Sequence, residues 1–238
     1  MPRTNEAPME LSRLQELAAQ AQRQGRCRFT PFLTPPEAEL AQAAAKRERV
    51  DCCLFGGYED AERRMARFLP VMEEDEPFPI TALQIGWPRQ DAPTHRDLLG
   101  SVMGLGVKRA CIGDIVLQKD CAYLFAETAM ARVIAEQLCE AGRIRLQVRL
   151  CEALPEAEAA EGEEIRFTVQ SARLDAIIAD AFHLARGKAA ELIEAGCVKL
   201  KHRPTLRADA RVEADDVISV RGFGRIKVVS VGEPTRKG

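Results

Sequence analysis

The stretch RLDAIIADAFHLARGKAAELIEAGCVKL, residues 173–200, carries two short helical patterns followed by a strand-like segment. The apolar residues of the first pattern recur every three or four positions, as on one face of a helix: Leu174, Ile177, Ile178, Ala181 and Phe182. A second group repeats this spacing: Ala189, Leu192 and Ile193. Gly196 then suits the left-handed conformation that often ends a helix. The stretch therefore predicts two helices joined by a tight turn.

Two cations, Arg186 and Lys188, stand at the start of the second predicted helix. Cations at this end oppose the helix dipole, whose positive pole lies at the N-terminus. The first backbone N–H groups of a helix also lack partners within the helix and bind anions readily. The position of these cations is therefore mildly unfavourable by itself, and it becomes favourable when a phosphate arrives. We interpret the helix start as an anion site.

The strand-like segment that follows extends this basic character. Lys199 and Lys201 alternate with Val198 and Leu200, so the lysines point to one side and the apolar residues to the other. We expect a phosphate-tracking basic face with these members: Arg173, Arg186, Lys188, Lys199, Lys201 and Arg203. Arg225 is counted with them as a candidate RNA-binding residue. The alternative is a lysine-rich edge that is simply solvated.

The composition is that of an ordinary globular protein of 238 residues, 46% hydrophobic and 29% charged. The first residues show no apolar signal-peptide core, and no apolar run is long enough to span a membrane. We therefore expect a cytoplasmic protein without membrane partners. Residues 166–238 carry 14 Lys and Arg against 9 Asp and Glu, a net charge of +5. Residues 1–165 carry 20 against 27, or −7, so a polyanionic partner for the C-terminal part is favoured.

The eight cysteines and three histidines do not form a metal-binding pattern. No C-x-x-C pair occurs and the histidines lie far apart, so we expect neither a metal nor a cofactor. Most cysteines fall within apolar patterns and are interpreted as buried, reduced thiols. The adjacent Cys52 and Cys53 could form a redox pair, although nothing nearby favours this.

We predict an α+β protein with three units and an acidic linker. A small α/β unit, residues 1–72, contains a helix ending near Gly25, a helix capped by Thr34, a short buried strand in VDCCLFGGY and a helix in AERRMARFLP. The linker, PEAEAAEGEE at 155–164, has no apolar periodicity. Residues 165–238 form the third unit.

The central unit, residues 77–154, shows the order β-α-β-β-α-β, which is that of ferredoxin-like and RNA-recognition folds. Its predicted strands are ITALQIGW, IGDIVLQ, CAYLFAE and RIRLQVRL; its predicted helices are THRDLLGSVMGLG and TAMARVIAEQLCEAG, the latter ending at Gly142. Tyr123 and Phe125 share one face of a central strand, where such folds stack bases. Burial in the core is the favoured location for one or both. Tyr123 is kept as a candidate second RNA contact.

Motifs that would indicate catalysis are incomplete in this sequence. HRDL at 95–98 matches the start of a kinase catalytic loop, but the Asn, DFG and glycine-rich loop that a kinase needs are absent. The glycines of GSVMGLGVKR fit neither nucleotide-binding spacing, although the following Lys108 and Arg109 are candidates for contacting a phosphate. No nucleophile and base can be paired from the sequence. We therefore expect a non-enzymatic protein.

The C-terminal unit resembles the S4 RNA-binding domain. R-L-D at 173–175, the R-x-x-A-x-x-L-I-x-x-G-x-V pattern from Arg186 and D-x-I-x-V from Asp216 match that family between about Phe167 and Val231. The resemblance assigns RNA contacts to the basic residues named above. Three departures are visible. Ala185 replaces the usual Ser and therefore lacks a side chain that could cap the helix. Lys201-His202 replaces a common Asn-Gly, so the turn should differ. Asp215 replaces a common Gly.

Taken over its whole length, the chain resembles the bacterial YlmH family. HRDLLGSVMGLGVKRACIGDIVL, from His95 to Leu117, is the most recognisable part. The resemblance implies a non-catalytic protein of the large ribosomal subunit that binds rRNA and the adjacent tRNA. It would act in rescue of stalled peptidyl-tRNA complexes and C-terminal tailing of nascent chains. Protein partners of the N-terminal units are also expected. Two alternatives remain: an RNA-modifying enzyme resembling pseudouridine synthases or rRNA methyltransferases, and a cell-division adaptor.

Overall fold

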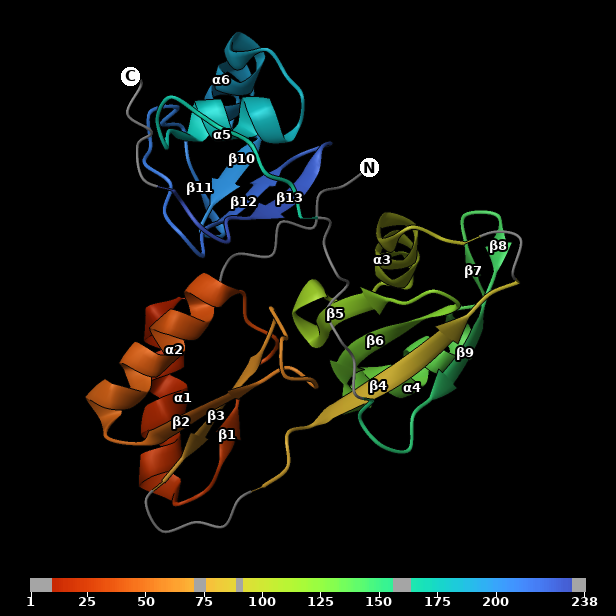
Figure 1. The fold of residues 1–238 in the computed structure, drawn as a ribbon. Coiled ribbons are helices and arrows are strands. Elements are labelled where there is room, and N and C mark those ends of the chain that lie inside the picture. The colour runs from red at the N-terminus through yellow and green to blue at the C-terminus, as the bar shows by residue number, and fades with distance from the viewer. Residues whose placement is uncertain (1–9, 71–75, 89–91, 156–163, 233–238) are drawn as a thin grey trace. The chain divides into compact units, whose positions relative to one another are not determined.

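The computed structural model describes residues 10–70, 76–88, 92–155 and 164–232. The chain forms two compact units, Met1–Glu161 and Gly162–Gly238. Both are mixed α/β structures with antiparallel sheets (Figure 1). The first unit contains both the predicted N-terminal part and the predicted central part. The predicted acidic linker at 155–164 lies almost wholly outside the described residues, and the division into three units stays a prediction.

The N-terminal part of the first unit packs two helices on a three-stranded sheet (Figure 1). Helix α1 spans Leu11–Gln24 and α2 spans Pro35–Glu48. The strands β1 (Arg28–Phe29), β2 (Asp51–Phe55) and β3 (Met65–Leu69) lie in the order β1-β3-β2. As predicted, Thr34 caps α2, and it does so in a capping box with Glu37.

The predicted helix in AERRMARFLP is wrong, because Met65–Leu69 forms the central strand of this sheet. The first four residues of β3 are all buried, since one face of this strand packs on the helices and the other faces a second sheet. A short strand covered on both faces has a continuous apolar pattern that period alone cannot distinguish from a helix. The strand β2 is present as predicted. It is an edge strand with exposed and half-buried residues, however, and is not the buried strand we expected.

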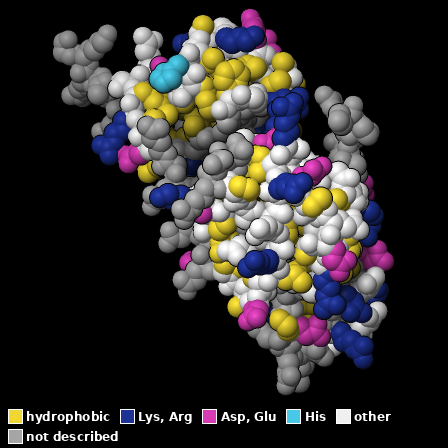
Figure 2. Space-filling model, turned by 90° about the vertical axis from the view of Figure 1, so that its right-hand side faces the viewer, with side chains coloured by type: hydrophobic (Ala, Val, Ile, Leu, Met, Phe, Trp, Pro, Cys, Tyr) yellow, Lys and Arg dark blue, Asp and Glu magenta, His cyan; other side chains and the backbone are white. Residues whose placement is uncertain are grey.

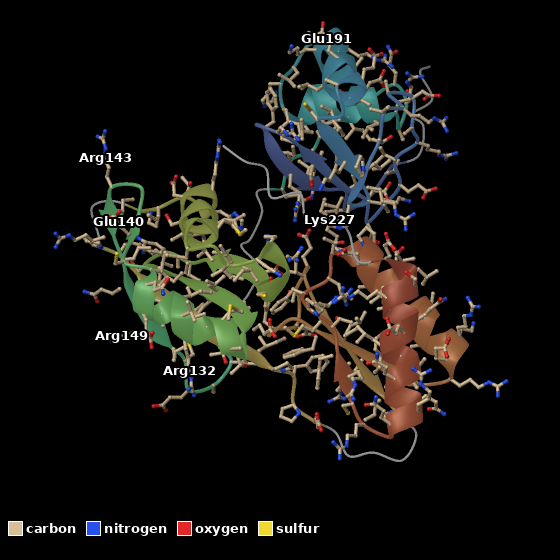
Figure 3. All side chains as sticks on the ribbon, turned by 180° about the vertical axis from the view of Figure 1, so that it is seen from behind. Arg132, Glu140, Arg143, Arg149, Glu191 and Lys227 are labelled. Carbon is tan, nitrogen blue, oxygen red and sulfur yellow. The ribbon has the colours of Figure 1, made fainter. Side chains whose placement is uncertain are left out.

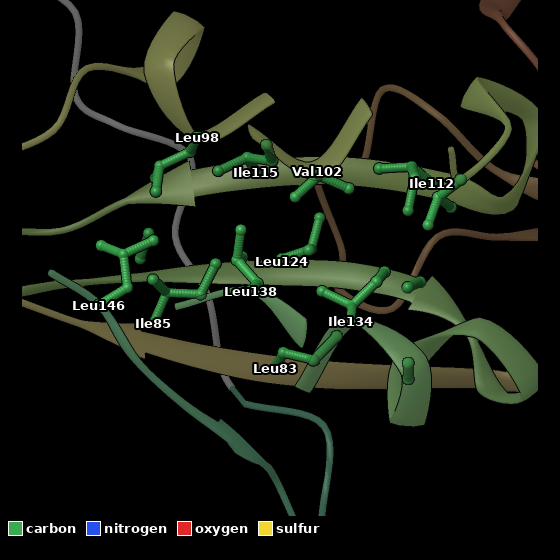
Figure 4. Packing of buried hydrophobic residues seen from close by; sticks show 14 of the residues in the cluster. Leu83, Ile85, Leu98, Val102, Ile112, Ile115, Leu124, Ile134, Leu138 and Leu146 are labelled. Atoms are coloured by element: carbon green, nitrogen blue, oxygen red, sulfur yellow. The ribbon is translucent and has the colours of Figure 1, made fainter. Parts of the chain in front are cut away.

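The central part of the first unit contains a four-stranded antiparallel sheet in the order β5-β6-β4-β9. Its strands are β4 (Ile80–Gly86), β5 (Ile112–Leu117), β6 (Cys121–Glu127) and β9 (Gln147–Leu150). Helices α3 (His95–Gly104) and α4 (Thr128–Gln137) cover one face, and a 3-10 turn spans Arg109–Cys111. Figure 4 shows the aliphatic core between this face and the helices. Along the chain, the main strands and helices follow the predicted β-α-β-β-α-β order.

The end of this part differs from the prediction. Helix α4 ends at Gln137 and not at Gly142. Gly142, with φ +62°, lies instead in the turn of a small hairpin formed by β7 (Glu140–Ala141) and β8 (Ile144–Arg145). A glycine with positive φ suits a helix end and a hairpin turn equally, which explains the error. The predicted last strand is consequently divided into β8 and β9.

The other face of the four-stranded sheet packs against the N-terminal part. The ring of Phe125, on β6, stacks on Tyr58 with centroids 5.0 Å apart. Asp114, on β5, accepts hydrogen bonds from the Tyr58 hydroxyl at 3.0 Å and from the backbone N–H of Glu62 at 2.7 Å. Arg63 donates to the backbone carbonyls of Ile112 at 3.0 Å and Phe32 at 2.8 Å. The contacts with Phe125, Asp114 and Ile112 join the two sheets into one unit.

In the C-terminal unit, helices α5 (Leu174–Ala181) and α6 (Arg186–Glu194) are where the sequence predicts them. They pack on one face of a four-stranded antiparallel sheet with the order β11-β10-β12-β13 (Figure 1). The strands span the following residues: β10 Val198–Leu200, β11 Arg203–Pro204, β12 Val217–Val220 and β13 Gly224–Lys227. Val198, Ile218 and Val220 form the strand side of this core. Gly196 has φ +68° and ends α6 as expected.

The turn between β10 and β11 has the geometry that Asn-Gly commonly forms, although the sequence Lys201-His202 predicts a different turn. Leu200 pairs with Arg203, which leaves Lys201 and His202 as a two-residue turn. Their φ values are +51° and +62°. Positive φ at both central residues is the requirement of the type I′ turn, for which Asn-Gly is preferred. The expected change of turn is therefore wrong, because Lys and His adopt the left-handed conformation here. Asp215, another departure from the S4 pattern, also has positive φ, +65°.

Candidate nucleic-acid interface

At the start of α6 the anion comes from the chain itself. Asp175, in the first turn of α5, is only 5% exposed. Its carboxylate accepts hydrogen bonds from Nε and Nη2 of Arg173, both at 3.0 Å. It also accepts one from Nε of Arg186, at 3.2 Å. The carboxylate therefore holds together two arginines for which the sequence predicts phosphate contacts, and we call these three residues the helix-start group.

The electrostatics of the helix-start group follow from these contacts. Hydrogen bonds from Arg173, followed by those from Arg186 and the charges of both arginines, lower the pKa of Asp175 to about 2 although its burial acts against this. The hydrogen bond to Asp175 likewise raises the pKa of Arg173. At neutral pH the group thus carries one net positive charge on two oriented guanidinium groups. The side chains of Arg173 and Arg186 are 41% and 54% exposed, so both remain accessible to a ligand.

Lys188 is also paired within the chain. Its Nζ lies 3.0 Å from Oε2 of Glu191, one turn further along α6, and both side chains are exposed. Ala185 occupies the N-cap position and makes no side-chain cap, as the sequence predicts. An exposed pair of this kind contributes little to stability and is easily exchanged for a stronger partner. The start of α6 therefore presents cations that are only partly neutralised.

A second basic surface lies on the sheet face that points away from the helices. Lys199, Ser219 and Arg225 are directly opposite one another on β10, β12 and β13. Opposite residues share a face, and their neighbours Val198 and Val220 belong to the core, so this row points outward. Nε of Arg225 donates to Oγ of Ser219 at 3.1 Å. Lys227 takes the next outward position on β13, and Arg221 directly follows β12 in the turn. We use the name outer-face cations for these residues together with Lys201, which directly follows β10: Lys199, Lys201, Arg221, Arg225 and Lys227.

The outer face carries more positive than negative charge. Among the described residues, no Asp or Glu occupies an outward position of β10, β12 or β13. Lys201 forms ion pairs with Glu213 and Asp216 at its edge, each at 3.1 Å. Lys227 lies 3.7 Å from Asp215. Within the part of the chain that the structure describes, Lys199 and Arg221 form no ion pair. Lys199 and Arg221 can therefore bind a polyanion without first breaking an ion pair of their own.

The single basic face expected from the sequence is therefore two groups of residues. The helix-start group and Lys188 belong to the helix layer, whereas Lys199 and Arg225 project from the far side of the sheet. Figure 3 shows Glu191 on α6 and Lys227 on β13 at opposite sides of this unit. Arg203 is exposed on the edge strand β11. The expectation of a single face was wrong because the alternation of side chains along a strand does not show which side of the sheet the helices cover.

Two outer-face cations, Arg221 and Lys227, were missed by sequence reasoning. The segment VISVRGFGRIK alternates buried Ile218 and Val220 with outward residues, and the same alternation resumes after the turn at Gly224. This alternation of buried and outward residues is the sequence signal from which the two cations could have been predicted.

The central candidates Lys108, Arg109 and Tyr123 have different environments. Nη1 of Arg109 donates to the carbonyls of Ile112 at 2.6 Å and Gly113 at 3.1 Å, so its guanidinium supports the local backbone. Lys108 is exposed beside it and forms no ion pair within the described residues. Tyr123 is half-buried at the edge of the packed region. Only part of this sheet face is open, because the N-terminal part covers Phe125.

Comparison with known proteins places this geometry in a family. Residues 6–68 match a family model described as "YlmH, N-terminal", and residues 73–154 match one described as "Putative RNA-binding domain in YlmH". The chain is also 32% identical over 220 residues to "Ribosome-associated protein quality control protein P2" of Bacillus subtilis strain 168. That alignment covers 91% of this chain and 86% of the relative. The chain belongs to the YlmH family. The family resemblance seen in the sequence is thus confirmed.

A solved structure supports the fold of this YlmH family member. It is described as "Cell division protein ylmH from Streptococcus pneumoniae", with a TM-score of 0.52 and 23% identity. The match covers 59% of this chain and 88% of the other. At this identity the likeness concerns the fold alone.

Two further features of the structure bear on function. None of the helices in the described residues is both long and apolar enough to cross a membrane. Nor do the described residues bring three or more His, Cys, Asp or Glu side chains together as a metal site would require.

Proposed function

We propose that this protein binds structured RNA of the ribosome through its C-terminal unit, without chemically altering the RNA. The observation that carries the proposal is the outer sheet face, where Lys199, Arg225 and Lys227 occupy outward positions and, among the described residues, acids occupy none on β10, β12 or β13. Phosphate contacts of this kind supply affinity, and the shape of folded RNA supplies much of the selectivity. The relative from Bacillus subtilis, whose name places it in ribosome-associated quality control, supports a ribosomal target.

The finer assignment of folds is part of this proposal. We propose that residues 165–238 are an S4 domain, which the helix pair and the late β12 strand support. We also propose that the central part is a ferredoxin-like unit. Its main strands lie in the spatial order second, third, first, fourth, which agrees with that fold.

The specific role that we propose is binding of the large ribosomal subunit, at rRNA and the adjacent tRNA, in the cytoplasm. There the protein would stabilise a stalled peptidyl-tRNA complex during rescue and C-terminal tailing of the nascent chain. The charge asymmetry suits this role, because the basic C-terminal part is attracted to RNA while the remainder of the chain carries net negative charge. The N-terminal and central parts are then available for further contacts to RNA or protein.

Co-sedimentation with purified large ribosomal subunits across a salt series tests the proposal. The wild-type protein should bind with a steep salt dependence. The variant Lys199→Gln/Arg225→Gln should bind more weakly, with its slope of log affinity against log salt reduced by about 0.7 to 0.9 for each phosphate that the variant no longer neutralises. Arg186→Gln tests the helix-start group separately. The matched control is Lys46→Gln/Arg47→Gln, which removes the same charge from the exposed end of α2.

Two results would contradict the proposal. Equal binding by the wild type, the outer-face variant and Arg186→Gln at every salt concentration would remove the C-terminal unit from the interface. Covalent modification of the RNA after incubation with the protein would instead support an RNA-modifying enzyme.

A further inference from the structure

The segment 221–225, which contains the turn between β12 and β13 and the start of β13, exposes an aromatic ring. Its sequence is RGFGR, and Phe223 lies between Gly222 with φ +88° and Gly224 with φ +132°. Residues that carry a side chain rarely adopt such backbone conformations, so both glycines suit this turn. The backbone N–H of Phe223 donates to the carbonyl of Val220 at 3.1 Å, which closes the turn. The geometry thus fixes Phe223 at the tip of a short, well-defined turn.

The Phe223 side chain remains 44% exposed although it is large and apolar. Its ring lies 6.0 Å from the ring of Phe182, at an interplanar angle of 59°. Phe182 itself packs against the core of the unit, so the pair anchors Phe223 from one side. Aromatic pairs prefer tilted geometries of this kind. Phe223 is therefore oriented by one neighbour while much of its surface stays open to solvent.

Cations stand close to Phe223 in the sequence. Arg221 and Arg225 flank it in the sequence, and Arg225 lies in the row with Ser219 and Lys199. Within the described residues Arg221 forms no ion pair. An exposed aromatic ring with an arginine two residues away on each side offers partners for the two chemical parts of a nucleotide: a flat apolar base and a phosphate.

Figure 2 shows that hydrophobic side chains gather on the visible face of the C-terminal unit, with Lys and Arg, and also some Asp and Glu, at the margins of this surface. Exposed apolar surface next to positive charge is typical of single-strand binding surfaces, where bases stack on aromatics and cations follow the backbone. A purely electrostatic RNA surface would not need the ring.

We propose that Phe223 stacks on an unpaired base of the bound RNA, while Arg221 and Arg225 contact the phosphates on either side of that base. The inference rests on the proposed function and deepens it: it assigns a preference for RNA with unpaired nucleotides to one turn. Stacking needs only the flat face of a base, so the turn recognises an unstacked nucleotide of any sequence.

Binding of the full chain to two short RNAs tests the inference. One probe is an RNA hairpin with a loop of adenosines that contains a single 2-aminopurine, whose fluorescence reports stacking. The other is a blunt duplex with the same number of phosphates. Phe223→Ala should weaken binding to the hairpin by about 5-fold to 150-fold, since removal of a stacked aromatic costs roughly 1–3 kcal/mol per base. Duplex binding should stay within about twofold, because phosphate contacts dominate there.

Three further variants separate stacking from other effects. Phe223→Leu keeps an apolar contact to Phe182 but has no flat ring, so it should lose the 2-aminopurine signal even if Phe223→Ala folds poorly. Phe223→Tyr should retain the signal. Leu206→Ala is the matched control, because Leu206 is 64% exposed in the same unit and should have no effect on either RNA.

The outcomes distinguish this inference from the proposed function. A hairpin affinity and a 2-aminopurine signal that are unchanged in Phe223→Ala and Phe223→Leu would overturn the inference alone. Equal losses on hairpin and duplex would also overturn it, because they indicate a general effect on the fold of the unit. If the wild-type protein bound neither probe and did not sediment with large ribosomal subunits, the proposed function itself would fail.

Discussion

At the scale of single residues, Asp175 changes the interpretation of the C-terminal unit. From the sequence alone, an external phosphate explains why Arg186 stands at a helix start. The structure supplies a carboxylate from α5, eleven positions earlier in the chain. Asp175 is part of the R-L-D motif, but no local pattern indicates that its partner lies on the next helix. A ligand phosphate therefore meets two arginines that are already positioned.

The first prediction concerns the acid stability of this helix-start group. The pKa of Asp175 is lowered from 3.8 to about 2, so its stabilisation is present above about pH 4 and is lost as the pH falls towards 2. Asp175→Asn should lower the free energy of unfolding by about 1–2 kcal/mol at pH 7, with the exposed arginines reducing the effect. It should also flatten the pH dependence between about pH 4 and pH 2. Urea unfolding followed by far-ultraviolet circular dichroism measures both.

Asp180→Asn is the control for this prediction, because Asp180 is exposed on the same helix and forms no ion pair within the described residues. If both variants lost the same stability, or if Asp175→Asn kept the acid transition of the wild type, the carboxylate would not act as described.

A second residue-scale prediction concerns the missing cap of α6. Ala185 is at the N-cap with extended backbone, φ −64° and ψ 139°, which is the conformation that a capping serine adopts. Ala185→Ser should therefore raise the free energy of unfolding by about 0.5–2 kcal/mol. The midpoint of urea unfolding, followed by circular dichroism, measures the gain. An unchanged midpoint would show that the first N–H groups of α6 are already satisfied.

At the scale of elements, the helices with caps and a clear period were predictable from the sequence, and the short strands were not. Thr34 and Thr94 both form the capping boxes that their sequences indicate. The strand β3 was missed because its burial on both faces removes the alternation that identifies a strand. The two-residue strand β1 is too short to carry any period. Tertiary packing, and not local propensity, determines these elements.

The same limit applies to the candidate interface. Most of its cations were predictable as individual residues, because they interrupt apolar patterns. Their grouping was not predictable, since it depends on which sheet face α5 and α6 cover. The pairing of Lys201 with Glu213 and Asp216 also joins segments that are distant in the sequence. Contacts of this kind follow from the fold and not from spacing.

The third prediction concerns the turn that follows β2. Gly57 has φ +105°, and a Cβ added there would lie 2.3 Å from Cδ1 of Phe125. Gly57→Ala should therefore destabilise the first unit by about 2 kcal/mol or more, through backbone strain and overlap with a buried ring. Trp87 is the only tryptophan of the chain and packs against the core of this unit, so its fluorescence follows unfolding directly.

The matched control for this prediction is Gly100→Ala. Gly100 is exposed within α3, and an added Cβ would meet nothing within 4 Å. Alanine there should be neutral or stabilising by up to about 1 kcal/mol, because alanine has the higher helix propensity. Equal effects of the two substitutions would show that Phe125 does not pack tightly against the turn.

At the scale of the whole molecule, the first unit is held together by a shared core. The face of the four-stranded sheet that α3 and α4 do not cover is partly covered by Phe32, Tyr58 and Met65. Asp114 and Arg63 connect the two parts further through hydrogen bonds to backbone groups. The central part therefore depends on the N-terminal part for the burial of apolar side chains such as Val116 and Phe125.

The last prediction follows from this dependence. A fragment of residues 1–161 should unfold in one cooperative transition, with Trp87 fluorescence and circular dichroism giving the same midpoint. A fragment of residues 77–154 should unfold at lower urea concentration and bind the dye ANS, because the sheet face around Phe125 becomes exposed apolar surface. If the shorter fragment stayed monomeric, bound no dye and kept the midpoint of the longer one, the two parts would be independent domains. The central sheet would then be free to present its whole face, Tyr123 included, to RNA.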